Sequence, residues 1–232
     1  MEKSDDQKNY EKFMAGYVDY MMEEEDFDSF YAYGPLTNKY WTFKPRILVC
    51  NLEPYDEREG FVKVNIDLYK EWIKVNTGKN SARFITGLTK KLNKDNLNES
   101  IRFDNLSILE LLNHMENVAY MNFRISSGRI VNADIKNILN EVQTFKGYLV
   151  SQIKLLSPNI IIIGGVEGCR AFNLLFEADL NFNTTIEFDS KVISSIKHPS
   201  RADYKYYNEK VIEILNCYQV IQKKYINELI TF

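Results

Sequence analysis

The sequence predicts an α/β fold, in the form of a three-layer α/β/α sandwich around a short, mostly parallel four-stranded sheet. Two observations lead to this prediction. Short apolar segments alternate along the chain with longer segments whose apolar residues recur at helical spacing. The segment 159–163 (NIIII) is apolar from its second residue onward, as expected of a central parallel strand that is buried on both faces.

Each predicted strand is a short apolar run that ends at polar or turn-forming residues. The first follows Pro45, the second ends at Asn122, and the fourth is followed by His198-Pro199-Ser200. The four segments are 46–50, 118–121, 159–163 and 191–196.

Helices are predicted where apolar residues recur every three or four positions. The longest such pattern, 134–156, stops at Ser157-Pro158 and indicates one long amphipathic helix. An acidic helix is expected before the first strand. The other helical segments are 70–76, 82–92, 105–114, 166–176 and 203–226.

A length of 232 residues predicts one α/β domain, 46–232, preceded by an acidic helical N-terminal extension, 1–45. With 45% hydrophobic and 26% charged residues, a disordered chain, a fibrous repeat and a small disulfide scaffold are excluded. Residues 1–30 hold ten acids and three lysines, a net charge of −7; because the whole chain carries −3, the remainder carries +4. This acidic segment is expected to act either as a cover that mimics phosphates or as a solvated helix.

The cysteine pattern and the apolar runs set expectations about compartment and cofactors. No run approaches the roughly 20 apolar residues of a membrane-spanning helix, and no secretory signal is visible. Cys50, Cys169 and Cys217 show no CxxC spacing, which indicates free thiols in a reducing compartment rather than a zinc or iron–sulfur site. We expect a cytoplasmic protein that binds no metal ion and no cofactor and does not associate with a membrane. We also expect it to be a monomer.

Polar residues follow the carboxyl end of every predicted strand. Ligands of parallel α/β sheets bind at this edge, so the sequence predicts a site there. The loops concerned are 51–56, 122–127, 164–168 and 197–201.

Three of these loops carry residues suited to chemistry. Glu53, ahead of Pro54, can position or deprotonate water or stabilise a developing cation. His198 can donate to a leaving-group oxygen that becomes negative, and the amide of Asn122 can read adjacent C=O and N–H groups. Each also has a structural interpretation, as a polar turn, a hydrogen-bonding histidine and a loop cap.

Together and in this order, NLEPYD (51–56), AYMN (119–122) and KHPSRA (197–202) resemble the GQDPYH, LLLN and HPSPLS loops of the uracil-DNA glycosylase superfamily. The segment SPNIIIIGG (157–165) resembles the third strand of that superfamily. The resemblance spans about 46–226. It implies a glycosylase that hydrolyses the N-glycosidic bond of a flipped-out uracil or other damaged or modified base, with single- or double-stranded DNA as partner and no cofactor.

The resemblance also implies individual roles. Glu53 takes the place of the aspartate that orients water and stabilises the sugar cation, and His198 that of the histidine that stabilises charge on uracil O2. Asn122 takes the place of the asparagine that reads the uracil edge. Tyr55 stands where a tyrosine crowds C5 of the base, and Ser200 where a serine holds a DNA phosphate.

Several positions depart from the superfamily. Glu53 and Leu52 replace an aspartate and a polar residue, and Arg201-Ala202 replaces the Pro-Leu pair, so the leucine wedge is missing. Arg201 can instead reach a phosphate or a base. The aromatic residue that stacks on the base is expected to be Phe61, nearest the first loop, with Phe84 and Trp72 as alternatives.

Other interpretations stay open. A catalytically silent relative would bind DNA, a nucleotide or a protein through the same cleft, and the altered loops favour it. A third interpretation is an unrelated α/β hydrolase or nucleotide-binding protein, but the chain lacks the GxSxG, Walker and GxGxxG motifs that are typical of these classes, which argues against it. The segment 70–94, with seven bases and one acid, suits phosphate binding but also a solvated helix face.

Overall fold

The computed structural model of the chain describes residues 3–23, 29–52, 60–92, 105–126, 134–198 and 203–230. At its centre is a sheet of order β2-β5-β3-β6-β8-β7, in which β5, β3, β6 and β8 pair in parallel and the edge strands β2 and β7 are antiparallel. The strands are β2 (Gly34–Pro35), β3 (Ile47–Asn51), β5 (Val118–Asn122), β6 (Ile160–Gly164), β7 (Thr185–Phe188) and β8 (Lys191–Ile196).

The α/β class and the mostly parallel sheet are confirmed, whereas the predicted number of four strands is wrong, because the sheet has six. The four predicted segments are the parallel strands, whose apolar side chains are buried. The sequence pattern missed β2, which has two residues, and β7, whose side chains stay partly exposed. Strands were predicted from runs of apolar residues, and neither edge strand contains such a run.

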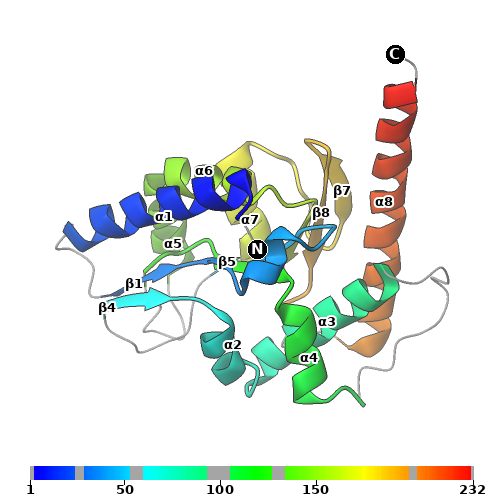
Figure 1. Cartoon of the computed structure of the whole chain (residues 1–232), viewed down its shortest axis with the longest axis horizontal. Helices are drawn as coiled ribbons and strands as arrows, with labels where there is room; N and C mark the ends of the chain where they lie inside the picture. The colour runs from blue at the N-terminus through cyan, green and yellow to red at the C-terminus, as the bar shows by residue number, and fades with distance from the viewer. Residues whose placement is uncertain are drawn as a thin grey trace.

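Helices surround this sheet, and a small second sheet pairs β1 with β4 in parallel (Figure 1). The predicted helix 134–156 is two helices, which separate at Phe145 (φ −97°, ψ 15°) because α5 packs against α7 while α6 also packs against α1. The elements are α1 (Asp5–Glu23), β1 (Ser29–Ala32), the 3-10 helix η1 (Asn38–Trp41), β4 (Gly60–Lys63), α2 (Ile66–Trp72), α3 (Asn76–Leu92), α4 (Ile108–Met115), α5 (Ile135–Thr144), α6 (Lys146–Leu156), α7 (Gly165–Phe176) and α8 (Tyr204–Ile230).

Residues 3–23 belong to the same core as the sheet. Tyr10, Tyr17 and Met21 of α1 are buried, and the helix packs against α6. The carboxylate of Asp6 pairs at 2.7 Å with Arg46, whose side chain is buried just before β3. The predicted N-terminal extension therefore packs directly on the domain. Among the described residues, no helix is long and apolar enough to cross a membrane.

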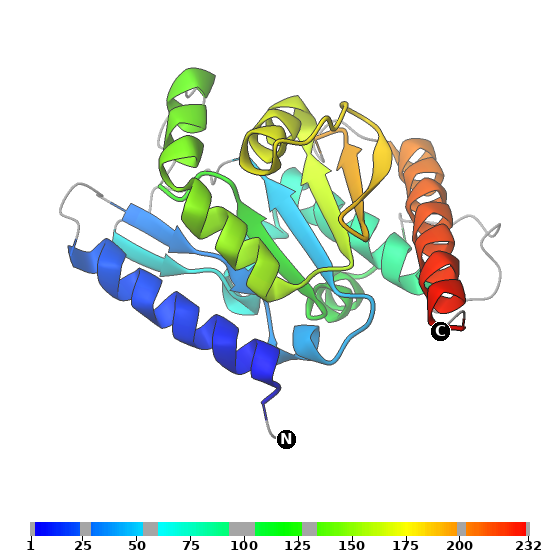
Figure 2. The same ribbon diagram turned by 90° about the horizontal axis from the view of Figure 1, so that it is seen from above.

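The helices α3 and α7 lie on opposite faces of the sheet (Figure 2). Phe84 of α3 shares a pocket with Ile162, whereas a Cβ on Gly168 of α7 would lie 3.0 Å from Cγ2 of Ile163. Successive residues of a strand point to opposite faces. The helix α3 after β3 and the helix α7 after β6 thus lie on opposite faces of the sheet. The carboxyl ends of these two neighbouring strands form a topological switch point, which is where open α/β sheets bind their ligands.

Candidate functional site

A small pocket lies at this switch point, between α3 and the carboxyl ends of β3, β6 and β8. Its inner volume is about 10 Å³, the space of roughly one water molecule. Most of its lining is apolar, and Phe84 provides an aromatic wall. The lining residues are Val49, Asn51, Ser81, Phe84, Ile85, Ile162, Gly164 and Ile196. A pocket of this size has room for a single small polar group or one water molecule.

The two polar side chains of the pocket, Asn51 and Ser81, are 6% and 4% exposed. Within the described part of the chain, Asn51 Oδ1 and Ser81 Oγ have no hydrogen-bond partner, and we call them the two open polar atoms. Leaving a buried polar atom unpaired costs about 1–3 kcal/mol. The pocket is therefore equipped to receive a hydrogen-bonding group.

The orientation of the Asn51 amide is set by a tyrosine. Asn51 Nδ2 donates to Tyr120 Oη at 2.6 Å, which directs Oδ1 away from this contact. The Tyr120 ring is held in turn by Tyr69 and Trp72, at centroid distances of 5.7 and 5.6 Å. Burial raises the pKa of Tyr120 to about 12, although the hydrogen bond from Asn51 lowers it, so the phenol stays protonated near neutral pH.

A close fit between α2 and α3 positions Ser81 and Phe84. A Cβ on Gly78 would lie 2.2 Å from the backbone oxygen of Trp72, so only glycine fits at this point. The Tyr69 hydroxyl donates to the Gly78 carbonyl at 3.0 Å and fixes the same junction. About one and two turns further along α3, Ser81 and Phe84 face the pocket.

The strand β6 enters α7 through Gly164-Gly165. Gly165 has φ +80°, a conformation that favours glycine, and makes a tight turn from the strand into the helix. Among the described residues, no side chain caps the start of α7. Because Gly164 lines the pocket, the first amides of α7 and the positive end of its dipole lie beside it, where they favour negative charge.

His198 lies half-buried, two residues beyond β8 and next to α7. A Cβ on Gly165 would be 3.9 Å from His198 Cβ and 4.0 Å from its Cδ2. The backbone ahead of the histidine is held by Tyr206, whose hydroxyl accepts from the Lys197 N–H at 2.7 Å and donates to Asn183 Oδ1 at 2.6 Å. His198 therefore lies at the same sheet edge as the pocket.

Asn122, the predicted reader of the base edge, lies directly opposite Asn51 in the β3–β5 pairing. It is 1% exposed and its Nδ2 donates to Tyr33 Oη at 3.0 Å, while its Oδ1 has no partner in the described chain. The described lining of the pocket includes Asn51 but not Asn122.

The loop after β5 is fixed by Glu141 of α5. Glu141 Oε1 accepts the backbone N–H groups of Ile125 and Ser126 at 3.0 and 2.8 Å. Its Oε2 accepts from Arg124 Nε at 3.1 Å and from the Ser126 hydroxyl at 2.7 Å. One carboxylate thus positions the residues that follow Asn122.

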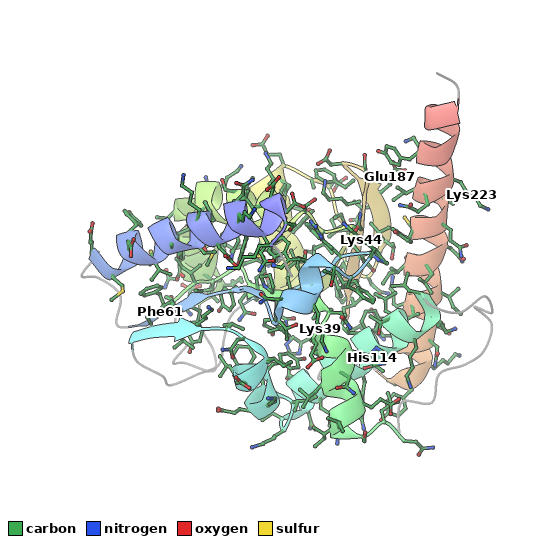
Figure 3. The ribbon with its side chains drawn as sticks, in the orientation of Figure 1. Lys39, Lys44, Phe61, His114, Glu187 and Lys223 are labelled. Atoms are coloured by element: carbon green, nitrogen blue, oxygen red, sulfur yellow. The ribbon has the colours of Figure 1, made fainter. Side chains whose placement is uncertain are left out.

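The three aromatic candidates occupy different places. Phe61 lies on β4, is 42% exposed and packs on Phe30 with ring centroids 5.2 Å apart (Figure 3). Trp72 packs on Tyr120, as described above. Phe84 is the candidate that lines the pocket.

The predictions for Glu53, Tyr55, Ser200 and Arg201 fall outside the described residues and stay predictions. Sequence reasoning missed Asn51 and Ser81 as site residues. A polar residue that ends an apolar buried strand was a signal for Asn51. Ser81 lies in a helical, basic segment that gave no such signal.

The basic segment offers less charge than its composition indicates. Lys70 and Lys90 form ion pairs with Asp67 and Glu110, and Lys91 is 2% exposed. Three of the seven bases of this segment are therefore paired with acidic residues of the protein or buried, and they add little positive charge to its surface. In the described ranges, no cluster of three or more His, Cys, Asp or Glu residues could hold a metal ion.

No protein-family model matches the chain, and no curated protein matches it significantly.

Proposed function

We propose that this chain is a DNA glycosylase of the uracil-DNA glycosylase type, which binds a flipped-out base at the carboxyl edge of the sheet and hydrolyses its N-glycosidic bond. One observation supports this most. The three motifs that carry the resemblance leave the same edge of one parallel sheet, because β3 ends two residues before Glu53, β5 ends at Asn122 and β8 ends two residues before His198. The helices on both faces of the sheet fit the three-layer arrangement that the resemblance implies.

The proposed reaction divides its charges between two loops. Attack of water on C1′ breaks the bond to the base, with positive charge growing on the sugar and negative charge on the base. Glu53 orients the water and stabilises the sugar cation. His198 stabilises the departing base. Its position beside the start of α7, which no described side chain caps, supports this role, because a histidine donor and the start of a helix each favour a nearby negative charge.

The remaining predicted residues belong to substrate binding. In this proposal Asn122 and Tyr55 line the base site, while Ser200 and Arg201 contact DNA. Phe84 lines the pocket at the switch point but is 1% exposed, so the exposed Phe61 stays the expected stacking residue. Flipping the base out of the stack costs a few kcal/mol, which contacts of this kind offset.

A product assay tests the proposal. Labelled single- and double-stranded oligonucleotides carry uracil, hypoxanthine, xanthine or modified cytosines, and alkali cleaves any abasic site. We expect cleavage at one base, lost in Glu53→Ala and His198→Ala. His114→Asn is the matched control, because His114 lies on α4 and contacts Thr89 rather than the sheet edge (Figure 3). Unchanged cleavage in both site variants, or no abasic product from folded protein, would contradict the proposal.

A second candidate function is a catalytically silent relative that binds DNA or a nucleotide at the same edge. The observation that favours it is the small pocket, together with the Asn122 amide nitrogen already bound to Tyr33. This function predicts measurable affinity for the same oligonucleotides, read by fluorescence anisotropy, without abasic product.

A further inference from the structure

The two open polar atoms restrict what can enter the pocket. Asn51 Oδ1 can only accept hydrogen bonds, whereas Ser81 Oγ can accept and donate. The space between the pocket walls holds about one non-hydrogen atom with its hydrogens. An amino group presents two N–H donors in such a space and can satisfy both atoms at once. A carbonyl oxygen cannot bond to Asn51 Oδ1, because both atoms are acceptors.

The surroundings of the two open polar atoms are apolar. Phe84 contributes an aromatic wall, and Ile162 and Ile196 contribute apolar surface. In a pocket of about 10 Å³ these walls enclose only the inserted polar group, and the ring that carries it lies outside the pocket. Tyr120, itself 8% exposed, keeps the Asn51 amide in the accepting orientation through the 2.6 Å bond to Nδ2.

We propose that the base recognised at this site carries an exocyclic amino group, as derivatives of cytosine and adenine do, and that Asn51 and Ser81 are the residues that read it. This inference rests on the proposed function only for the identity of the ligand as a nucleobase. It assigns to Asn51 and Ser81 a specificity that separates amino-bearing bases from their keto counterparts.

Binding of non-cleavable DNA tests the inference separately from catalysis. Single-stranded oligonucleotides carry one central base on a 2′-fluoro sugar, which resists hydrolysis of the glycosidic bond. Two pairs are compared, cytosine with uracil and adenine with hypoxanthine, because each pair exchanges an amino group for a keto oxygen. The dissociation constants are measured by fluorescence anisotropy, and circular dichroism checks the fold of every variant.

We expect the wild-type protein to bind the amino member of at least one pair about tenfold more tightly, the effect of one or two hydrogen bonds. Ser81→Ala and Asn51→Leu should bring the ratio close to one. Thr86→Val is the matched control: Thr86 lies on the same helix with a buried hydroxyl that also has no partner in the described chain, but it does not line the pocket. This variant should keep the wild-type ratio.

Three results would overturn the inference: equal affinities in the wild-type protein, a preference for the keto member, or an unchanged ratio in Ser81→Ala. Equal affinities would mean that the pocket holds only a buried water molecule. A preference for the keto base would mean that the Asn51 amide is flipped, with Nδ2 facing the pocket and Oδ1 facing Tyr120. The product assay separates this inference from the proposed function. A preference for the amino base without abasic product supports this inference and contradicts the proposed glycosylase activity. Cleavage without a preference supports the glycosylase activity and contradicts this inference.

Discussion

Asn51 and Asn122 lie directly opposite each other at the last paired position of the neighbouring parallel strands β3 and β5. Each amide nitrogen donates to a tyrosine hydroxyl, that of Tyr120 or Tyr33, and each Oδ1 is unpaired in the described chain. Both residues are more than nine-tenths buried. Two such acceptors at one sheet edge lower stability unless a water molecule or a ligand supplies donors to them.

Ser81→Ala should stabilise the protein in the absence of ligand. The variant removes a buried hydroxyl that lacks a partner in the described residues, so we expect the free energy of unfolding to rise by about 1 kcal/mol. Chemical denaturation measures this change. Ser195→Ala is the control and should be destabilising, because the Ser195 hydroxyl contacts Cys169 Sγ at 2.7 Å and accepts from the Asn183 N–H at 3.2 Å. Equal losses in both variants would show that Ser81 is bonded within the protein.

Gly78→Ala should destabilise the junction of α2 and α3. The added Cβ meets the Trp72 backbone oxygen at 2.2 Å, which cannot move without displacing α2, so we expect a loss of about 1–3 kcal/mol. Gly16→Ala in α1 is the opposite case, since no described atom lies within 4 Å of its Cβ. Replacing this helical glycine should stabilise by up to about 1 kcal/mol. Thermal denaturation of the two variants gives the comparison, and a neutral Gly78→Ala would mean that the junction is looser than the contact indicates.

Glu141→Gln should weaken the loop that follows β5. The carboxylate accepts four hydrogen bonds there, and an amide must turn its NH₂ group toward some of the same donors. We expect a loss of about 2–3 kcal/mol, typical of hydrogen bonds to a charged group. Glu177→Gln removes a charge from an exposed pair with Lys146 and should change stability by less than about 0.5 kcal/mol. Similar effects of the two substitutions in urea denaturation would argue against this network.

The parts of the fold that could be predicted from the sequence are those with a strong local pattern. The four parallel strands are apolar runs, whereas β2 and β7 form only through pairing with a neighbour. The position of His198 at a strand end follows from the same pattern. The end of an apolar run marks Asn51 as a residue of the sheet edge. That Asn51 Oδ1 and Ser81 Oγ have no partner among the described residues could not be predicted, because hydrogen-bond pairing is a property of the packed structure. Phe84 reaches the pocket since α3 folds back over β3, while nearness in sequence pointed to Phe61.

His114 should make stability depend on pH below about 7. Burial lowers the pKa of His114 below 6.5, and Lys90 lowers it further while Glu110 raises it. The unfolded chain therefore binds the proton first as the pH falls, so stability is highest above the unfolded pKa and decreases as the pH drops through 6.5 toward the folded pKa. The pKa values of Glu11 and Glu110 are lowered from 4.5, so their contributions are lost only at more acidic pH. Melting temperatures measured from pH 7.5 to 5 should fall for the wild-type protein and less steeply for His114→Asn, whose side chain does not titrate. Parallel profiles would show that protonation of His114 does not oppose folding.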